Sequence, residues 1–208
     1  MPTKKSAISE VYQIKVTLLG TKPPIWRRLH VPASMTLARL HEVLQEAMGW
    51  HDCHLHEFQV GGRRIGPPDP DAEPMGMPDV EDESKVRLSR VLREVGAKMR
   101  YEYDFGDGWE HEIVLEKRLP ADPEVAYPWC SGGEYGCPPE DCGGVHGYDE
   151  LVRVIANPNH KRHQEMLDWV GEEYDPEIFS VDDVNVRLSV WHRRRGRAPI
   201  DQLRPRYA

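Results

Sequence analysis

Apolar and polar residues alternate in two short stretches near the N-terminal end, Tyr12 to Leu19 and Trp26 to Val31, both rich in β-forming residues. A Lys-Pro-Pro turn separates them, so we predict a strand, a connection and a second strand. From Thr36 the pattern changes to helical spacing, and Gly49 ends it. We therefore expect a helix that packs on the sheet through Leu37, Leu40, Val43, Leu44 and Ala47.

The segment HLHEFQV (residues 54–60) predicts a third strand, with His54, His56 and Phe58 on one face. The pair Gly61-Gly62 predicts a hairpin turn that returns the chain. Residues 66–84 then contain five prolines and seven acidic residues and few apolar ones, which is typical of a mobile loop.

Two further strands are predicted at Lys98 to Asp104 and Trp109 to Lys117, joined by the turn sequence Phe-Gly-Asp-Gly. A loop rich in glycine and cysteine follows a proline-containing link. Helical spacing then returns in three segments, the third weaker than the others. These segments are Tyr148 to Ala156, Lys161 to Val170 and Val181 to Val190.

These elements predict an α+β fold, with a mixed or mainly antiparallel sheet. One helix packs on the sheet early in the chain, and the other helices cluster in the C-terminal third. The chain shows no internal repeat. Its 208 residues suffice for one domain, which we place at residues 12–190, between a flexible N-terminus (1–11) and an arginine-rich tail (191–208).

The charge of the chain is divided unevenly. The net charge is −8, but residues 191–208 contain six arginines and one aspartate, which leaves the remainder at −13. A basic tail on an acidic body predicts one of three states. It could make weak nucleic-acid contacts, fold back on its own domain, or stay solvated.

No apolar run approaches the roughly 20 residues of a membrane span, so we expect no membrane partner. The N-terminus lacks the apolar stretch of a secretory signal, and we expect a cytoplasmic location. In that compartment four cysteines are expected to be thiols or metal ligands rather than disulfides.

The glycine- and cysteine-rich loop contains a candidate zinc site. Its order is Cys-x6-Cys-x4-Cys-x3-His, and glycines throughout the loop would let it bend around a tetrahedral ion. The alternative is that the cysteines are simply buried thiols. The candidate ligands are Cys130, Cys137, Cys142 and His146.

A second candidate site combines imidazoles and carboxylates. Such a set could hold a divalent metal, perform acid/base chemistry or bind a polar ligand. Alternatively, each histidine is a satisfied sheet residue and each aspartate a turn residue. The candidates are His54, His56, Asp104, Asp107, Trp109 and His111. We expect Asp104, Asp107 and His111 to face the same cleft as the first two histidines.

Further along the chain, Glu140 and Asp141 could form an acidic cation site, or Asp141 could cap the local turn. No serine elbow, phosphate loop, dinucleotide fingerprint or His-Glu-x-x-His helix is present. The Asp-Phe-Gly sequence is not that of a kinase, because a glycine-rich phosphate loop and a His-Arg-Asp loop are missing.

Six segments in order, PPIWRRLHVP, LHEVLQEAMGW, HLHEFQV, YEYDFGDGWEHEI, CPPEDCGGVHGY and FSVDDVNVRL, resemble the plasmid pRiA4b ORF-3-like family over roughly residues 12–188. The resemblance implies a compact α+β domain of a family often found on mobile genetic elements, some of whose members are labelled transposon resolvases. It implies no defined activity. At the matching positions the polar residues are His54, His56, Asp104, Asp107, Trp109, His111, Glu140 and Asp141.

Two hypotheses follow. The first is a non-enzymatic binding or interaction domain, associated with mobile elements, whose partner is a protein or a small ligand. The second is a metal-dependent hydrolase or nuclease that uses the histidine and aspartate set. A metal with an open coordination position would favour the enzyme.

Overall fold

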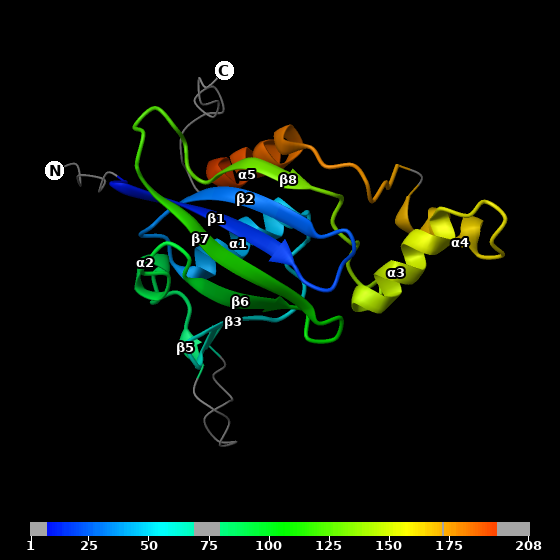
Figure 1. Cartoon of the computed structure of the whole chain (residues 1–208), viewed down its shortest axis with the longest axis horizontal. Helices are drawn as coiled ribbons and strands as arrows, with labels where there is room; N and C mark the ends of the chain where they lie inside the picture. The colour runs from blue at the N-terminus through cyan, green and yellow to red at the C-terminus, as the bar shows by residue number, and fades with distance from the viewer. Residues whose placement is uncertain (1–7, 69–79, 172, 195–208) are drawn as a thin grey trace.

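The computed structural model of the chain describes residues 8–68, 80–171 and 173–194. Its centre is one eight-stranded sheet with the strand order β5-β4-β3-β6-β7-β1-β2-β8 (Figure 1). The strands are β1 (Glu10–Leu18), β2 (Ile25–Pro32), β3 (His56–Val60), β4 (Arg63–Gly66), β5 (Glu81–Asp82), β6 (Lys98–Tyr103), β7 (Trp109–Pro120) and β8 (Trp129–Glu134). The helices are α1 (Leu37–Met48), α2 (Leu88–Val91), α3 (Gly144–Ile155), α4 (His163–Val170) and α5 (Val181–Arg194).

The strand pairs are antiparallel except for β4 and β5, which run parallel. The predicted hairpin between β6 and β7 is present, with Tyr103 opposite Trp109 across the turn. Helix α1 comes early in the chain and the longer remaining helices come last. The predicted α+β fold is therefore confirmed.

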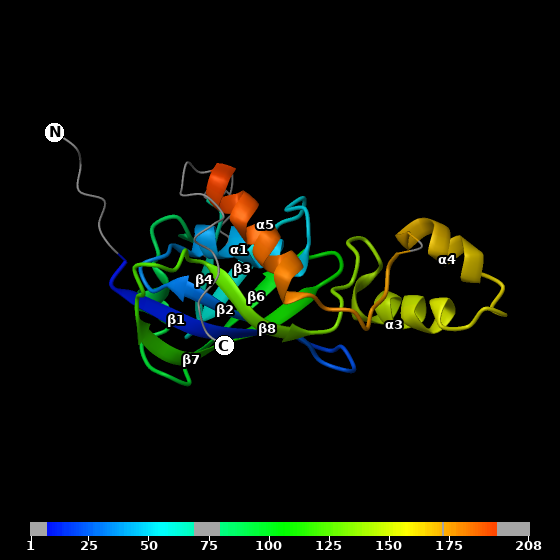
Figure 2. The same cartoon turned by 90° about the horizontal axis from the view of Figure 1, so that it is seen from above.

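Helices α1 and α5 lie side by side on one face of the sheet, whereas α3 and α4 lie beyond one end of it (Figure 2). The spacing that predicted α1 also determines its buried side: its five predicted apolar positions are at most 1% exposed. Helix α5 adds Val184, Leu188 and Trp191 to the same core. Burial of apolar surface between the sheet and these two helices supplies most of the driving force for folding.

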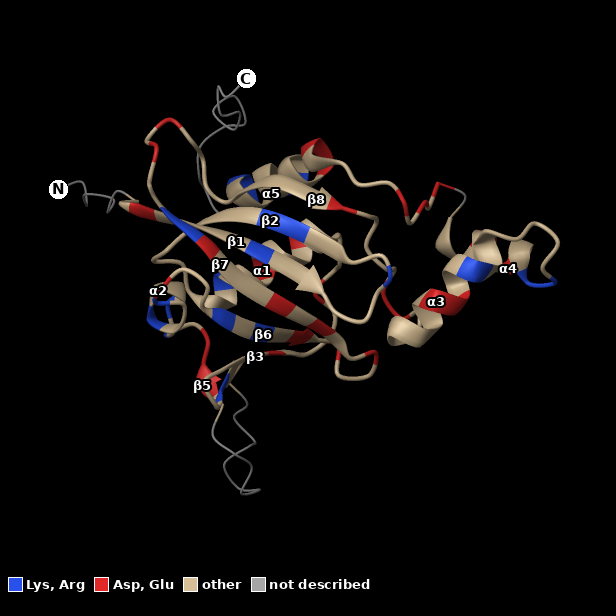
Figure 3. Cartoon of the chain, viewed as in Figure 1, with Lys and Arg blue, Asp and Glu red and all other residues tan. Residues whose placement is uncertain are grey.

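Charged residues of both signs lie along the strands of the sheet (Figure 3). They form ion pairs between strands, either directly adjacent or separated by one strand, which stabilises the sheet surface. The pairs include Arg28 with Glu116, Lys98 with Glu112, and Arg100 with Glu110.

Strand β8 lies within the segment that we predicted as a loop. Gly132 and Gly133 lower its strand propensity, but the tertiary structure requires Gly133. A Cβ atom on Gly133 would lie 2.5 Å from Phe179 Cζ and 2.7 Å from the Trp26 carbonyl oxygen. The pairing of β8 with β2 therefore depends on Gly133, a residue type that lowers the strand propensity of the segment.

The boundaries of the domain also differ from the prediction. Strand β1 begins at Glu10, and helix α5 continues through Trp191 and His192, both 5% exposed. The predicted loop at 66–84 contains β5 and the buried Glu83, while its residues 69–79 lie outside the described part. Most of the predicted arginine tail, residues 195–208, also lies outside it. In the described ranges, no helix has the length and apolar character that a membrane crossing requires.

Candidate functional site

Three connecting segments meet at one end of the sheet. The first is the link between α1 and β3, which starts at Gly49, a helix-ending residue with φ of 89°. The second is the turn between β6 and β7, and the third is the loop between β8 and α3. The indole Nε1 of Trp50 donates a 2.9 Å hydrogen bond to the Pro138 carbonyl and so ties the first segment to the third.

The imidazole of His54 lies where these segments converge. Its Nε2 is 3.3 Å from Asp141 Oδ1 and 3.7 Å from Asp104 Oδ2. This nitrogen is shielded from solvent and has no hydrogen-bond partner among the described residues. A nitrogen in this state, facing two carboxylates, is available to a ligand.

The two distances suit a metal better than direct hydrogen bonds, which are about 2.7–3.2 Å long. Imidazole and carboxylate ligands at about 2.0–2.2 Å from a tetrahedral ion lie roughly 3.3–3.6 Å from each other. The ligand atoms of His54, Asp104 and Asp141 all lie within 4.8 Å of one another. These three side chains could hold a divalent cation with little movement.

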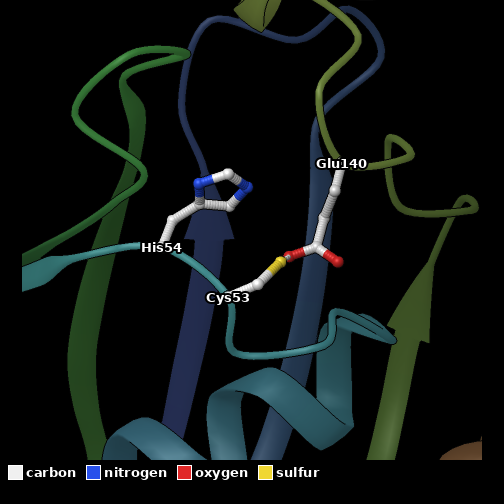
Figure 4. Close-up of side chains that lie close together, drawn as sticks. All are labelled: Cys53, His54 and Glu140. Carbon is white, nitrogen blue, oxygen red and sulfur yellow. Dashed lines mark hydrogen bonds between the residues drawn. The ribbon is translucent and has the colours of Figure 1, made fainter.

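Cys53 and Glu140 form a second group with His54, again with ligand atoms within 4.8 Å (Figure 4). The thiol of Cys53 donates to Glu140 Oε1 over 3.4 Å. The hydroxyl of Tyr103 donates to the same oxygen over 2.5 Å, and His51 donates to Oε2 over 2.7 Å. Glu140 thus joins all three segments through its two oxygens.

The pKa values in this network favour an ionised Glu140. Burial by itself would raise its pKa, but donors from Tyr103, His51 and Cys53 hold the pKa below its usual range. Burial and the neighbouring Glu140 carboxylate raise the pKa of the Cys53 thiol. Cys53 is therefore a protonated hydrogen-bond donor rather than a thiolate ligand at neutral pH.

Two of these aspartates have an uncommon backbone conformation. Asp104 and Asp141 have φ values of 56° and 59°, in the left-handed region. Aspartate tolerates this region through local hydrogen bonds, and Asp104 Oδ1 accepts one from the Gly106 amide at 2.9 Å. The other oxygen of Asp104, Oδ2, remains directed at His54.

A cavity of about 750 Å³ opens beside this cluster. Cys53, Glu140 and Asp141 lie on its wall, and the end of α1, the chain around Tyr174 and the start of α5 complete it. An ion bound at His54 would therefore lie at the rim of a space that can hold a small molecule.

The structure does not bring all of the predicted polar residues into this site. His56 lies under α1, stacked on His41 with ring centroids 3.4 Å apart, and its Nε2 is 2.8 Å from Glu83 Oε2. Trp109 and His111 are fully buried on the same helix-covered face. The alternation along β3 and β7 directs these side chains into the core, so they do not share a cleft with His54.

Asp107 also lies apart from the His54 cluster. Its Oδ2 accepts a 3.2 Å hydrogen bond from the Gly143 amide. Its carbonyl oxygen lies only 2.3 Å from where a Cβ atom of Gly144 would be. Asp107 therefore joins the β6–β7 turn to the start of α3, a structural role that differs from the ligand role we predicted.

The four candidate zinc ligands are not gathered. The described residues contain two groups of three or more potential ligands, and Cys130, Cys137, Cys142 and His146 belong to neither. Cys130 is fully buried, while burial raises the pKa of Cys137 and Cys142 to about 12. Protonated thiols pack well as small apolar groups, so the geometry does not support the zinc site that the spacing predicted.

Sequence reasoning missed Cys53, His51 and Tyr103. The run Trp-His-Asp-Cys-His immediately after the end of α1 holds four potential metal ligands in four residues and could have identified Cys53 and His51. Tyr103 carried no such signal, because its role depends on Glu140, which is 37 residues away.

Comparisons with known proteins agree with this fold. The family model for plasmid pRiA4b ORF-3-like proteins matches residues 10–183. An uncharacterized protein, y4hQ, from Sinorhizobium fredii is 41% identical over 186 residues, which cover 86% of this chain and 90% of the relative. The crystal structure of MM3350, a protein of unknown function from Methanosarcina mazei Go1, is similar with a TM-score of 0.76. It shares 36% identity, and the match covers 85% of this chain and 98% of that one.

Proposed function

The chain belongs to the plasmid pRiA4b ORF-3-like family, and we propose that it is a ligand-binding domain that holds a divalent metal ion through His54, Asp104 and Asp141. The observation that carries this proposal is the unpartnered Nε2 of His54, which faces one oxygen of each aspartate at 3.3 and 3.7 Å. An ion at their centre would satisfy this nitrogen and neutralise both carboxylates.

His54, Asp104 and Asp141 suit a metal ion better than Cys53 and Glu140 do. Cys53 is a protonated donor, and both oxygens of Glu140 already accept hydrogen bonds. In contrast, the Asp141 side chain is 72% exposed. One imidazole and two carboxylates suit zinc or manganese.

Three protein ligands leave at least one coordination position open to water or to a ligand from the cavity. A ligand that coordinates the ion would extend along Glu140 and Asp141 into the cavity. In this proposal the metal anchors one end of the ligand and the cavity wall selects the remainder.

Metal-dependent hydrolysis is the second candidate function, and the position of the Glu140 carboxylate favours it. This carboxylate has a ligand atom within 4.8 Å of that of His54, beside the proposed ion, where it could accept a proton from metal-bound water. Glu140→Gln should then retain metal but lose turnover of an activated ester such as bis-p-nitrophenyl phosphate. If the metal-loaded wild type shows no such turnover, the binding function alone remains.

Metal titration of untagged, chelator-treated protein tests the main proposal. We expect one zinc or manganese ion per chain by calorimetry and elemental analysis. His54→Ala should weaken binding by about 100-fold or more, because a ligand contributes at least as much as its supporting residues. Asp141→Asn should also weaken it.

Matched controls come from the exposed surface of α3, with His146→Ala for the histidine and Asp149→Asn for the aspartate. Neither should change the affinity. Metal binding that survives His54→Ala unchanged, or that is lost in His146→Ala, would refute the assignment.

A further inference from the structure

The cavity wall also contains two arginines that form no ion pair with a carboxylate in the described part of the chain. Arg27, on β2, is 3% exposed. Its Nε donates to the Ala47 carbonyl at 3.2 Å, and its Nη1 donates to the carbonyls of Trp26 and Glu134 at 2.9 and 3.0 Å. Its remaining nitrogen, Nη2, makes no hydrogen bond within the described ranges.

Arg187, on α5, is the second arginine. Its Nε donates to the Glu46 carbonyl at 2.8 Å, and its terminal nitrogens have no hydrogen-bond partner in the described part of the chain. Its guanidinium group lies 3.9 Å from where a Cβ atom of Gly49 would be, at the end of α1. Both arginines line the cavity, and the charge of Arg187 contributes to lowering the pKa of Arg27, after the larger effect of burial.

This arrangement differs from that of five more exposed arginines on the strands of the sheet. Those arginines form ion pairs with glutamates at 2.6 to 2.9 Å, and they are Arg28, Arg63, Arg64, Arg100 and Arg118. Five carboxylates also line the cavity, yet none forms an ion pair with Arg27 or Arg187 in the described ranges. The Glu46 carboxylate interacts electrostatically with Arg187 but forms no ion pair with it. Two neighbouring cations at a partly enclosed surface are costly unless anions compensate them.

The aromatic residues around the two arginines indicate which chemical groups a bound ligand would carry beside its anionic group. The guanidinium of Arg27 stacks over the Phe179 ring at 4.3 Å, which fixes its plane. Trp50, Trp169 and Tyr174 line the same cavity. A guanidinium held in this way can offer Nη2 in a fixed direction, and arginine is well suited to bind carboxylate and phosphate oxygens.

We propose that this cavity contains an anion-binding site, in which Arg27 and Arg187 bind the carboxylate or phosphate group of a small ligand with an aromatic or apolar body. The carbonyl contacts of Arg27 hold the guanidinium in place, and Arg187 supplies the second charge from α5. The site does not require the metal, because neither arginine touches His54, Asp104 or Asp141 in the described structure.

The test uses the full chain without metal, in chelator and at constant ionic strength. Phenyl phosphate, benzoate and inorganic phosphate are titrated calorimetrically. We expect saturable binding of at least one organic anion at one site per chain, and the stronger of phenyl phosphate and benzoate identifies the anionic group. Arg187→Gln should weaken binding by about tenfold or more, the effect of losing a charge-assisted hydrogen bond.

Arg93→Gln is the matched control, because it removes one positive charge from an exposed position outside the cavity wall. It should bind like the wild type. His54→Ala should also bind the anion normally, which separates this proposal from the metal site. Asp183→Asn removes a negative charge one helical turn from Arg187. Anion binding should therefore stay equal to that of the wild type or become stronger.

Two results would overturn the proposal. One is that none of the three anions binds to the wild type or to Asp183→Asn. The other is that Arg187→Gln and the wild type bind equally, which would place the anion elsewhere. Arg27 is not substituted in this test, because its contacts with three carbonyl groups also support the fold.

Discussion

Acid should destabilise this protein through the buried imidazole of His111, and the structure gives the size of the effect. His111 is fully buried on β7, with its Nδ1 3.2 Å from the Tyr101 carbonyl oxygen. Burial lowers its pKa from 6.5 to about 4. In the folded state the ring therefore stays neutral over a pH range in which the unfolded chain is protonated.

Proton linkage determines whether stability rises or falls with pH. A histidine with a lowered pKa in the folded state contributes its full stability above the unfolded pKa of 6.5, and that stability is lost as the pH falls toward about 4. Each pKa unit corresponds to about 1.4 kcal/mol. Between pH 7.5 and pH 4.5 His111 should thus remove roughly 2–3 kcal/mol from the free energy of unfolding.

Urea denaturation at several pH values, followed by tryptophan fluorescence, measures this loss. His111→Gln keeps a side-chain N–H that can donate to Tyr101 but does not titrate. Its free energy of unfolding should fall by roughly 2–3 kcal/mol less than that of the wild type over the same range. His146→Gln, at an exposed position on α3, should follow the wild type. Parallel curves for the wild type and His111→Gln would refute the reasoning.

Three further predictions concern the loops around the site. Asp107→Ala should lower the free energy of unfolding by roughly 0.5–1.5 kcal/mol, for the lost bond to the Gly143 amide, without changing metal affinity; loss of metal in calorimetry would contradict this. Gly144→Ala should cost about 2 kcal/mol or more in urea denaturation, because φ is 66° and the Cβ would meet the Asp107 carbonyl oxygen; a neutral effect would mean that the turn can shift. Cys142→Ser should leave the metal content, measured by elemental analysis, unchanged. Loss of the ion in this variant would instead support the predicted zinc site in the cysteine-rich loop.

The sequence alone determined the main elements of the fold. Apolar periodicity identified α1, β1 and β2, because a helix or strand that is buried on one side repeats its apolar residues at a fixed interval. Strand β3 followed a less regular pattern. The turn residues between β6 and β7 identified the hairpin. The glycine-containing β8 and the two-residue β5 depend on neighbours that are distant in sequence, and local patterns did not predict them.

In the candidate site too, local sequence patterns determined some features and tertiary contacts determined others. The sequence identified His54, Asp104, Glu140 and Asp141 as polar candidates, and these four lie at one end of the sheet. It could not separate them from His56 or His111, because residues in one motif point to the core or to the site according to strand direction and loop path. The tertiary structure alone brings Arg27 and Arg187 to one cavity, from positions 160 residues apart, where neither forms an ion pair with a carboxylate of the described residues. Such long-range contacts depend on how the helices pack on the sheet, and a one-dimensional pattern does not contain that information.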